Sequence, residues 1–179
     1  MFPGWDCVCK WGKRLTSGWK WVIVAITTHK GVSSADGRKR EEVFLGEFFH
    51  SLDGKGRVVL PSTFRRGLEE GCVVAKGQDG QLVIFSVDDF EAKAAEVMEK
   101  QQNRSGRRFS RTVFGGADHQ DLDKSGRLLV KPDLRRFAAL EGSTEVAVVG
   151  VFDHVELWNR DRYLTDRATG DESFVEEDD

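Results

Sequence analysis

The sequence predicts an α+β fold made of two tandem copies of a β-rich module with short helices, related by a pseudo-two-fold repeat. Residues 52–66 align without a gap on residues 122–136, and six of the fifteen positions are identical. Short apolar runs separated by glycine-rich turns follow each copy, a pattern typical of strands joined by hairpins. A module of roughly 50 residues buries little apolar surface. We therefore expect the copies to pack on one another and the chain to form oligomers.

The first copy predicts strands, tight turns and short helices in a definite order. Asp53-Gly54-Lys55-Gly56 has the composition of a turn, and Pro61 stands where a helix can begin. Gly77-Gln78-Asp79-Gly80 indicates a hairpin. The expected elements are strands at 44–52 and 57–60, a short helix around 64–68 ending near Gly71, strands at 72–75 and 82–85, and a helix capped by Asp88 that runs to about residue 102.

The second copy predicts the same order of elements after a connecting segment. The expected elements are a helix at 107–114 broken by Gly115-Gly116, a strand reaching Leu122, a turn at 123–126, a strand at 127–130, a helix at 132–139, strands at 145–151 and 155–158, and a final helix starting at Asp161. These elements divide the chain into a first domain at 47–89, connecting helices at 90–115, a second domain at 118–161, and a C-terminal helix end with an acidic, disordered tail at 162–179.

Residues 1–42 differ in character from the rest of the chain. They hold four of the five tryptophans and eight Lys or Arg against four Asp or Glu, with no sustained hydrophobic period except a candidate short strand at 21–28. We expect this extension to be disordered and the native protein to begin at residue 43 as Met, because Val43 can be encoded by the start codon GTG. A basic arm that binds DNA is the alternative.

Composition bounds the class of protein. No apolar run approaches the roughly 18 residues of a membrane span, and the three cysteines form neither a disulfide framework nor a metal motif. The formal net charge of −3 disfavours binding to nucleic acid, which is itself negatively charged. Local charge matters more than the sum, however, and residues 104–136 carry nine Lys or Arg against four Asp.

Each copy places an arginine four residues after an aspartate, and this pair admits two interpretations. In the structural one, Asp53 pairs with Arg57, and Asp123 with Arg127, to fix the shape of the turn. In the functional one, the arginine reaches phosphates or guanine edges, which suit its planar fork. We expect both to hold. The predicted loop-shaping residues are Asp53, Gly56, Asp123 and Gly126, and the predicted DNA-binding residues are Arg57, Arg127, Lys55, Lys124, Arg65 and Arg135.

Residues 43–164 resemble the MraZ family. The resemblance is carried by the segment from Phe44-Leu45-Gly46-Glu47-Phe48 through His50-Ser51-Leu52-Asp53-Gly54-Lys55-Gly56-Arg57 to Pro61, and in the second copy by Leu122-Asp123-Lys124-Ser125-Gly126-Arg127, Leu134-Arg135 and Glu156-Leu157-Trp158. Residues 1–42 have no counterpart in the family. Lys131 replaces Pro61 in the second copy, so we expect its helix to start one residue later and the two turns to contribute unequally.

The resemblance implies a bacterial transcription regulator of the cytoplasm and nucleoid. Such proteins have two tandem SpoVT/AbrB-like domains of the swapped-hairpin type. They assemble into homo-oligomeric rings and bind double-stranded DNA at short direct repeats upstream of their own gene, which heads the cell division and cell wall cluster. The resemblance implies no cofactor, no membrane and no small-molecule substrate.

Two other classes of function are alternatives to a DNA-binding regulator. An enzyme is disfavoured because the four histidines are scattered and no glycine-rich phosphate-binding loop occurs. An antitoxin or protein-interaction module is the closer rival, since AbrB-like domains also serve in antitoxins. An antitoxin usually couples one such domain to a long disordered tail, whereas this chain has two copies and a short tail.

Overall fold

The computed structural model describes residues 43–99, 103–142 and 145–176. The predictions for residues 1–42, for the helix end at about 102 and for the tail at 177–179 lie outside the described part. The elements are β1 (Phe44–Ser51), β2 (Arg57–Val59), α1 (Ser62–Arg65), the 3-10 helix η1 (Arg66–Leu68), β3 (Cys72–Lys76), β4 (Leu82–Ser86), α2 (Val87–Glu99), α3 (Arg104–Gly116), β5 (Asp118–Gln120), β6 (Arg127–Leu129), α4 (Pro132–Phe137), β7 (Glu145–Phe152), β8 (His154–Asn159) and α5 (Arg160–Glu176).

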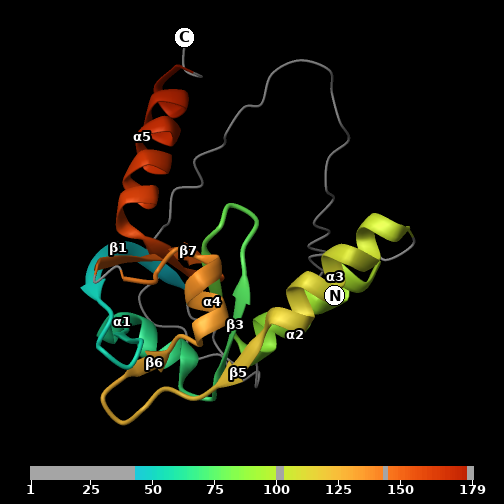
Figure 1. The fold of residues 1–179 in the computed structure, drawn as a ribbon, viewed down its shortest axis with the longest axis horizontal. Coiled ribbons are helices and arrows are strands. Elements are labelled where there is room, and N and C mark those ends of the chain that lie inside the picture. The colour runs from blue at the N-terminus through green and yellow to red at the C-terminus, as the bar shows by residue number, and fades with distance from the viewer. Residues whose placement is uncertain (1–42, 100–102, 143–144, 177–179) are drawn as a thin grey trace, which may run out of the picture. The chain divides into compact units, whose positions relative to one another are not determined.

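The two copies interleave in one antiparallel sheet (Figure 1), with the strand order β1-β7-β8-β4-β3-β5. The hairpin β7–β8 of the second copy pairs with β1 of the first, and the hairpin β3–β4 of the first pairs with β5 of the second. The equivalent strands β4 and β8 meet at the centre. The predicted α+β fold with a pseudo-two-fold repeat is confirmed. The ranges 47–89 and 118–161 contribute strands to the same sheet.

A second, two-stranded sheet joins the copies again. Strand β2 pairs antiparallel with β6, so that Val58 lies opposite Leu128 at the centre of the ribbon. These two side chains are fully buried, as are Leu60 and Val130 just beyond the strands. They belong to the same core as Phe64, which Phe44 and Phe48 both contact edge-on. The ribbon is therefore anchored to the molecule by its inner face.

The longer helices begin earlier than the sequence predicts, because their caps lie earlier. Ser86, rather than Asp88, caps α2: its Oγ accepts from the Asp89 amide at 3.1 Å. Asn103 caps α3 through an Oδ1 contact of 2.7 Å to the Gly106 amide, and Asn159 accepts from two amides at the start of α5. Helix α3 ends at Gly116, so the two glycines that were predicted to follow it are its last two residues.

Helix α5 is longer than the sequence suggests. It continues through Glu176, so that Asp171 and Glu172 are helical rather than part of a tail. Its first half is fastened to the sheet: Tyr163 donates to Glu47 at 2.8 Å, and Arg167 pairs with the same carboxylate. None of the helices in the described ranges is long and apolar enough to cross a membrane.

The helices α1 and α4 begin at equivalent positions, and the expectation that the second starts one residue later is wrong. Pro61 and Lys131 are the residues that precede them. Pro61 has φ −51° and ψ 141°, and Lys131 has φ −60° and ψ 151°. Lysine can adopt the dihedral angles that proline favours, so the exchange leaves the backbone unchanged.

Candidate nucleic-acid interface

The two aspartate–arginine turns are built alike. In the first turn the Asp53 carboxylate accepts from the backbone amides of Lys55 and Arg57, each at 2.9 Å. In the second, Asp123 accepts from the amides of Ser125 and Arg127 at 2.8 and 3.0 Å. A backbone bond from Gly56 to Asp53, and one from Gly126 to Asp123, closes each turn at 2.8 Å. In both copies, the aspartate therefore makes hydrogen bonds that can fix the shape of the turn.

Each aspartate also holds its arginine. The Arg57 Nε and Nη2 atoms lie 2.7 Å from Asp53 Oδ2, and Arg127 Nε lies 2.7 Å from Asp123 Oδ2. The hydrogen bonds from the Arg57 side chain and amide lower the pKa of Asp53 to about 2. Desolvation opposes the same shift at Asp123, but hydrogen bonds from Arg127 and Ser125 outweigh it and lower that pKa. Both carboxylates are charged at neutral pH.

The arginines lie on the outer face of the ribbon beside exposed apolar side chains. Because side chains alternate along a strand, Arg57 and Val59 share the face opposite buried Val58. Arg127 and Leu129 share the equivalent face of β6. The register places Arg57 opposite Leu129 and Val59 opposite Arg127. We call these four residues the ribbon face.

Val59 and Leu129 are the residues of this face that the sequence prediction missed. They are 37% and 44% exposed, although the repeat suggested only interchangeable apolar residues of a strand. The alternation in Arg57-Val58-Val59 was the signal that could have found them. Gln120 was missed as well. Its Nε2 donates to the Leu129 carbonyl at 2.8 Å, and its Oε1 accepts from the Leu129 amide at 3.2 Å.

Arg65 and Arg135, predicted to bind DNA, lie against the turn of the opposite copy. A Cβ atom at Gly126 would collide with the Arg65 side chain, and one at Gly56 would collide with Arg135. Arg65 also donates to the Leu60 carbonyl at 2.9 Å. Both arginines are half-buried. Each therefore braces a turn, and a role in DNA binding stays a prediction.

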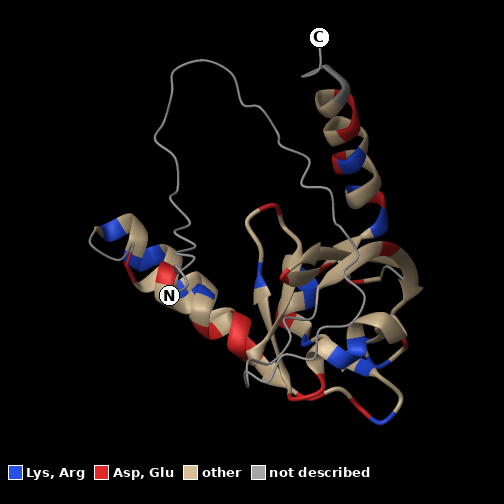
Figure 2. Cartoon of the chain, turned by 180° about the vertical axis from the view of Figure 1, so that it is seen from behind, with Lys and Arg blue, Asp and Glu red and all other residues tan. Residues whose placement is uncertain are grey.

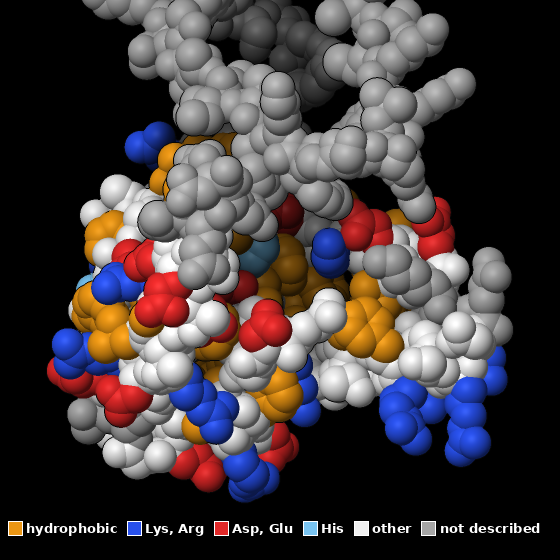
Figure 3. Space-filling model, turned by 90° about the horizontal axis from the view of Figure 1, so that it is seen from above, with side chains coloured by type: hydrophobic (Ala, Val, Ile, Leu, Met, Phe, Trp, Pro, Cys, Tyr) orange, Lys and Arg blue, Asp and Glu red, His pale blue; other side chains and the backbone are white. Residues whose placement is uncertain are grey.

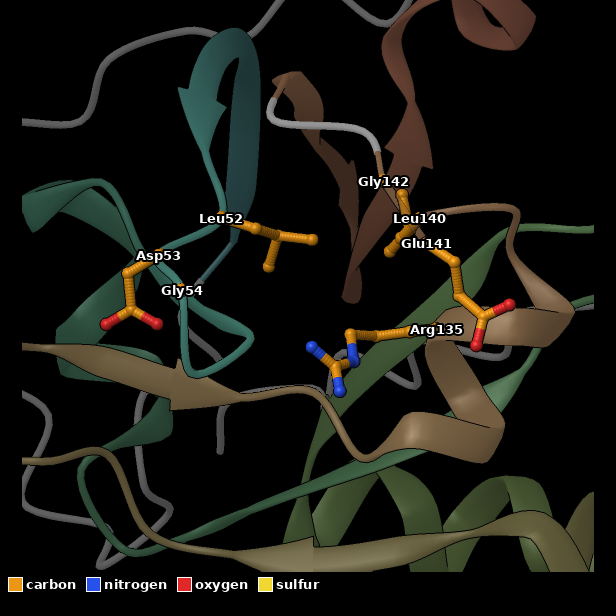
Figure 4. Close-up of a pocket in the computed structure, with 7 residues that line it drawn as sticks. All are labelled: Leu52, Asp53, Gly54, Arg135, Leu140, Glu141 and Gly142. Carbon is orange, nitrogen blue, oxygen red and sulfur yellow. The ribbon is translucent and has the colours of Figure 1, made fainter.

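An open cavity of about 400 Å³ separates the first turn from the end of α4 (Figure 4). Leu52, Asp53 and Gly54 line one side, and the Arg135 side chain extends toward them from the other. The Arg135 Nε atom is buried there without a hydrogen-bond partner among the described residues.

The lysines of the two turns differ in position. Lys55 is the third residue of its turn and Lys124 the second of its own, and both are exposed. No group of three or more His, Cys, Asp or Glu side chains that could hold a metal ion occurs in residues 43–99, 103–142 and 145–176.

Comparison with known proteins identifies the family. The model of the MraZ family, described as "MraZ protein, putative antitoxin-like", matches residues 43–112 and again 113–179. Proteins named Transcriptional regulator MraZ are similar to this chain. The one from Nocardioides sp. is 40% identical over 75% of this chain and 93% of its own length. The relative from Corynebacterium kroppenstedtii is 38% identical over 76% and 95%, and that from Finegoldia magna 37% over 68% and 84%. With two tandem matches and these relatives, the chain belongs to the MraZ family.

Proposed function

We propose that this chain is a sequence-specific transcriptional regulator that binds double-stranded DNA at short direct repeats upstream of its own gene and of the cell division and cell wall cluster. It acts in the cytoplasm, at the nucleoid, as a ring-shaped homo-oligomer. The name Transcriptional regulator MraZ, which its relatives carry, supports the class of function. The observation that carries the proposal is the ribbon face, where two arginines stand beside two exposed apolar side chains.

The ribbon face has the chemistry to read base edges. The major groove admits a two-stranded β-ribbon, arginine donates to guanine, and apolar side chains contact the thymine methyl group. Arg57 uses Nε and Nη2 on Asp53. Of the five N–H donors of a guanidinium, this leaves three. Two of them are on Nη1, which lies 4.0 Å from Asp123 Oδ2 of the opposite turn, beyond hydrogen-bond distance. Asp53 thus orients Arg57 and leaves some of its N–H donors available for DNA.

Assembly into a ring would offset the negative net charge. One subunit has a formal charge of −3, which disfavours binding to phosphates. A ring presents many ribbon faces at once, so linked contacts on repeated sites raise the overall affinity. The open edge of β1 and the exposed apolar side chains beside it, Leu45 and Phe152, support self-association.

Substitution of Arg57 tests whether the ribbon face binds DNA. We expect Arg57→Ala to abolish detectable binding to the upstream DNA in a fluorescence-anisotropy titration, because the readout donors are lost. The turn should survive, since the Asp53 carboxylate still accepts from two backbone amides. Circular dichroism checks the fold, and Arg162→Ala, an exposed arginine on α5, is the control. Unchanged affinity in Arg57→Ala would contradict the proposal.

An antitoxin role is the second candidate, because the family description contains the words antitoxin-like. The two functions differ in the partner that the native protein carries. Purification from its host with crosslinking should recover DNA from upstream of its own gene. Recovery of a stoichiometric toxin protein without that DNA would favour the second candidate.

A further inference from the structure

We propose that α3 carries a second DNA contact, which binds the phosphate backbone irrespective of base sequence. This inference rests on the proposed function and adds a surface on a different element from the two turns. Four arginines form it, and we call them the arginine stripe: Arg104, Arg107, Arg108 and Arg111.

The arginine stripe occupies the outer face of the helix. At 3.6 residues per turn, positions 104, 107, 108 and 111 fall within an arc of about 100°. All four are exposed. Phe109 and Val113 lie on the opposite side of the helix. Phe114 lies at the flank, and its ring meets Phe90 of α2 edge-on at 6.2 Å between centroids. The helix is thus held by one face and presents its arginines on the other.

Nothing in the described fold uses these charges. None of the four arginines has an ion pair or hydrogen-bonded side chain among the described residues, and α3 contains no Asp or Glu. Arginines three and four residues apart repel one another on a helix, and positive charge near a helix N-terminus is unfavourable. The arrangement opposes folding, so an external anion explains it better than a structural role does.

The charge of the hairpin formed by α2 and α3 is polarised. Figure 2 shows Asp and Glu along α2 and Lys and Arg along α3, and in Figure 3 the basic side chains project from one side of the right-hand lobe. The stripe spans about 10 Å at 1.5 Å per residue. Such a length of duplex carries about six phosphates, and the guanidinium fork suits phosphate oxygens. An acidic helix of a second copy is the rival occupant, and the experiment separates the two.

The salt dependence of binding tests the stripe. We would compare the full chain with Arg107→Gln/Arg111→Gln, using the upstream DNA and an unrelated duplex between 50 and 300 mM salt. Glutamine keeps the helix propensity close to that of arginine. Each lost phosphate contact reduces the slope of log K against log salt by about 0.9. We expect a slope shallower by about 1.8 and an affinity at least about tenfold weaker at 100 mM salt, by the same factor on both duplexes.

The control is Lys93→Gln/Arg162→Gln, which removes the same charge from α2 and α5 and should leave the slope unchanged. An equal effect in this control, or an unchanged slope in the stripe variant, overturns the proposal. A lower assembly mass by sedimentation velocity would instead assign the stripe to contacts between copies. If the wild-type chain shows no preference for the upstream DNA, the proposed function itself fails. If the wild-type chain prefers the upstream DNA and the stripe variant binds with the wild-type affinity and salt dependence, the further inference alone fails.

Discussion

Gly56 and Gly126 each meet two requirements of the turn. Their φ angles are +79° and +69°, in the left-handed region that L-residues with a side chain disfavour. Each also lies under the arginine of the opposite copy, where a Cβ atom would collide with the side chain. One residue type therefore serves both the backbone of one copy and the packing of the other.

Substitution of Gly56 should reveal the first of these requirements, the left-handed backbone conformation. We expect Gly56→Ala to lower the free energy of unfolding by about 1–2 kcal/mol, the cost of the left-handed conformation. Displacement of the flexible Arg135 side chain adds little. Gly54→Ala is the matched control within the same turn, because nothing lies within 4 Å of its Cβ position. Urea denaturation measures both variants, and equal stability of the two would contradict this account.

Turn residues could be predicted from the sequence because their chemistry is local. Asp53 followed by two glycines indicates a turn wherever the segment lies in the molecule, and the structure has one there. The exposure of Val59 and Leu129 was not predictable in the same way, because it depends on which face the rest of the chain covers. The bracing of Gly56 by Arg135 likewise joins residues far apart in the sequence.

At the scale of elements, the exchange of Pro61 for Lys131 between the copies is accompanied by an exchange of Phe48 for Asp118. Lys131 Nζ lies 2.5 Å from Asp118 Oδ1, and the Asp118 side chain is only 10% exposed. The residue equivalent to Asp118 in the first copy is Phe48, which packs on Phe64. A packed aromatic side chain in one copy therefore corresponds to an ion-paired carboxylate in the other, at the start of β5.

Removal of the Lys131 ammonium should destabilise this end of the fold. We expect Lys131→Gln to cost about 1 kcal/mol, between the values of exposed and buried pairs, because a nearly buried carboxylate loses its cation. Arg136→Gln is the control, since its pair with Asp133 is exposed on both sides and should contribute less than about 0.5 kcal/mol. Thermal unfolding compares them. A smaller loss for Lys131→Gln than for Arg136→Gln would refute the role of Asp118.

The sequence predicted most elements but not their partners. The hairpin at 77–80 and the strands beside it follow from local glycine and apolar patterns, and β3–β4 forms there. The pairing of β1 with β7 has no local signal, because the register that joins Phe44 to Phe152 depends on the whole core. Helix starts were displaced for a smaller reason: Ser86 caps α2 two residues before Asp88, the expected cap, and Asn159 caps α5 two residues before Asp161, the expected start.

At the scale of the whole molecule, the β1 edge is the surface best suited to self-association. Strand β1 ends the sheet, so its outer backbone groups have no strand partner among the described residues. Leu45 is 60% exposed and lies opposite Val151, which is also exposed. A protein that stays monomeric usually blunts such an edge with charge or proline.

A charge on this edge should weaken the proposed self-association. We expect Leu45→Lys to give a smaller species than the wild-type chain in sedimentation velocity, because repulsion between lysines replaces apolar contact. Far-ultraviolet circular dichroism should stay unchanged, since the side chain already faces solvent. Phe174→Lys, at an apolar site on α5 that is 74% exposed, is the control. An unchanged mass for Leu45→Lys would show that the copies do not associate through the β1 edge.

The interleaved sheet also has a consequence for synthesis. Strand β1 is made first, yet its partner β7 follows roughly 100 residues later, on the order of 5–20 s of translation. Until then β1 has no strand partner, and the sheet cannot close from one half of the chain. Folding is therefore expected to wait for almost the entire polypeptide, and nascent chains paused before β7 would depend on chaperones.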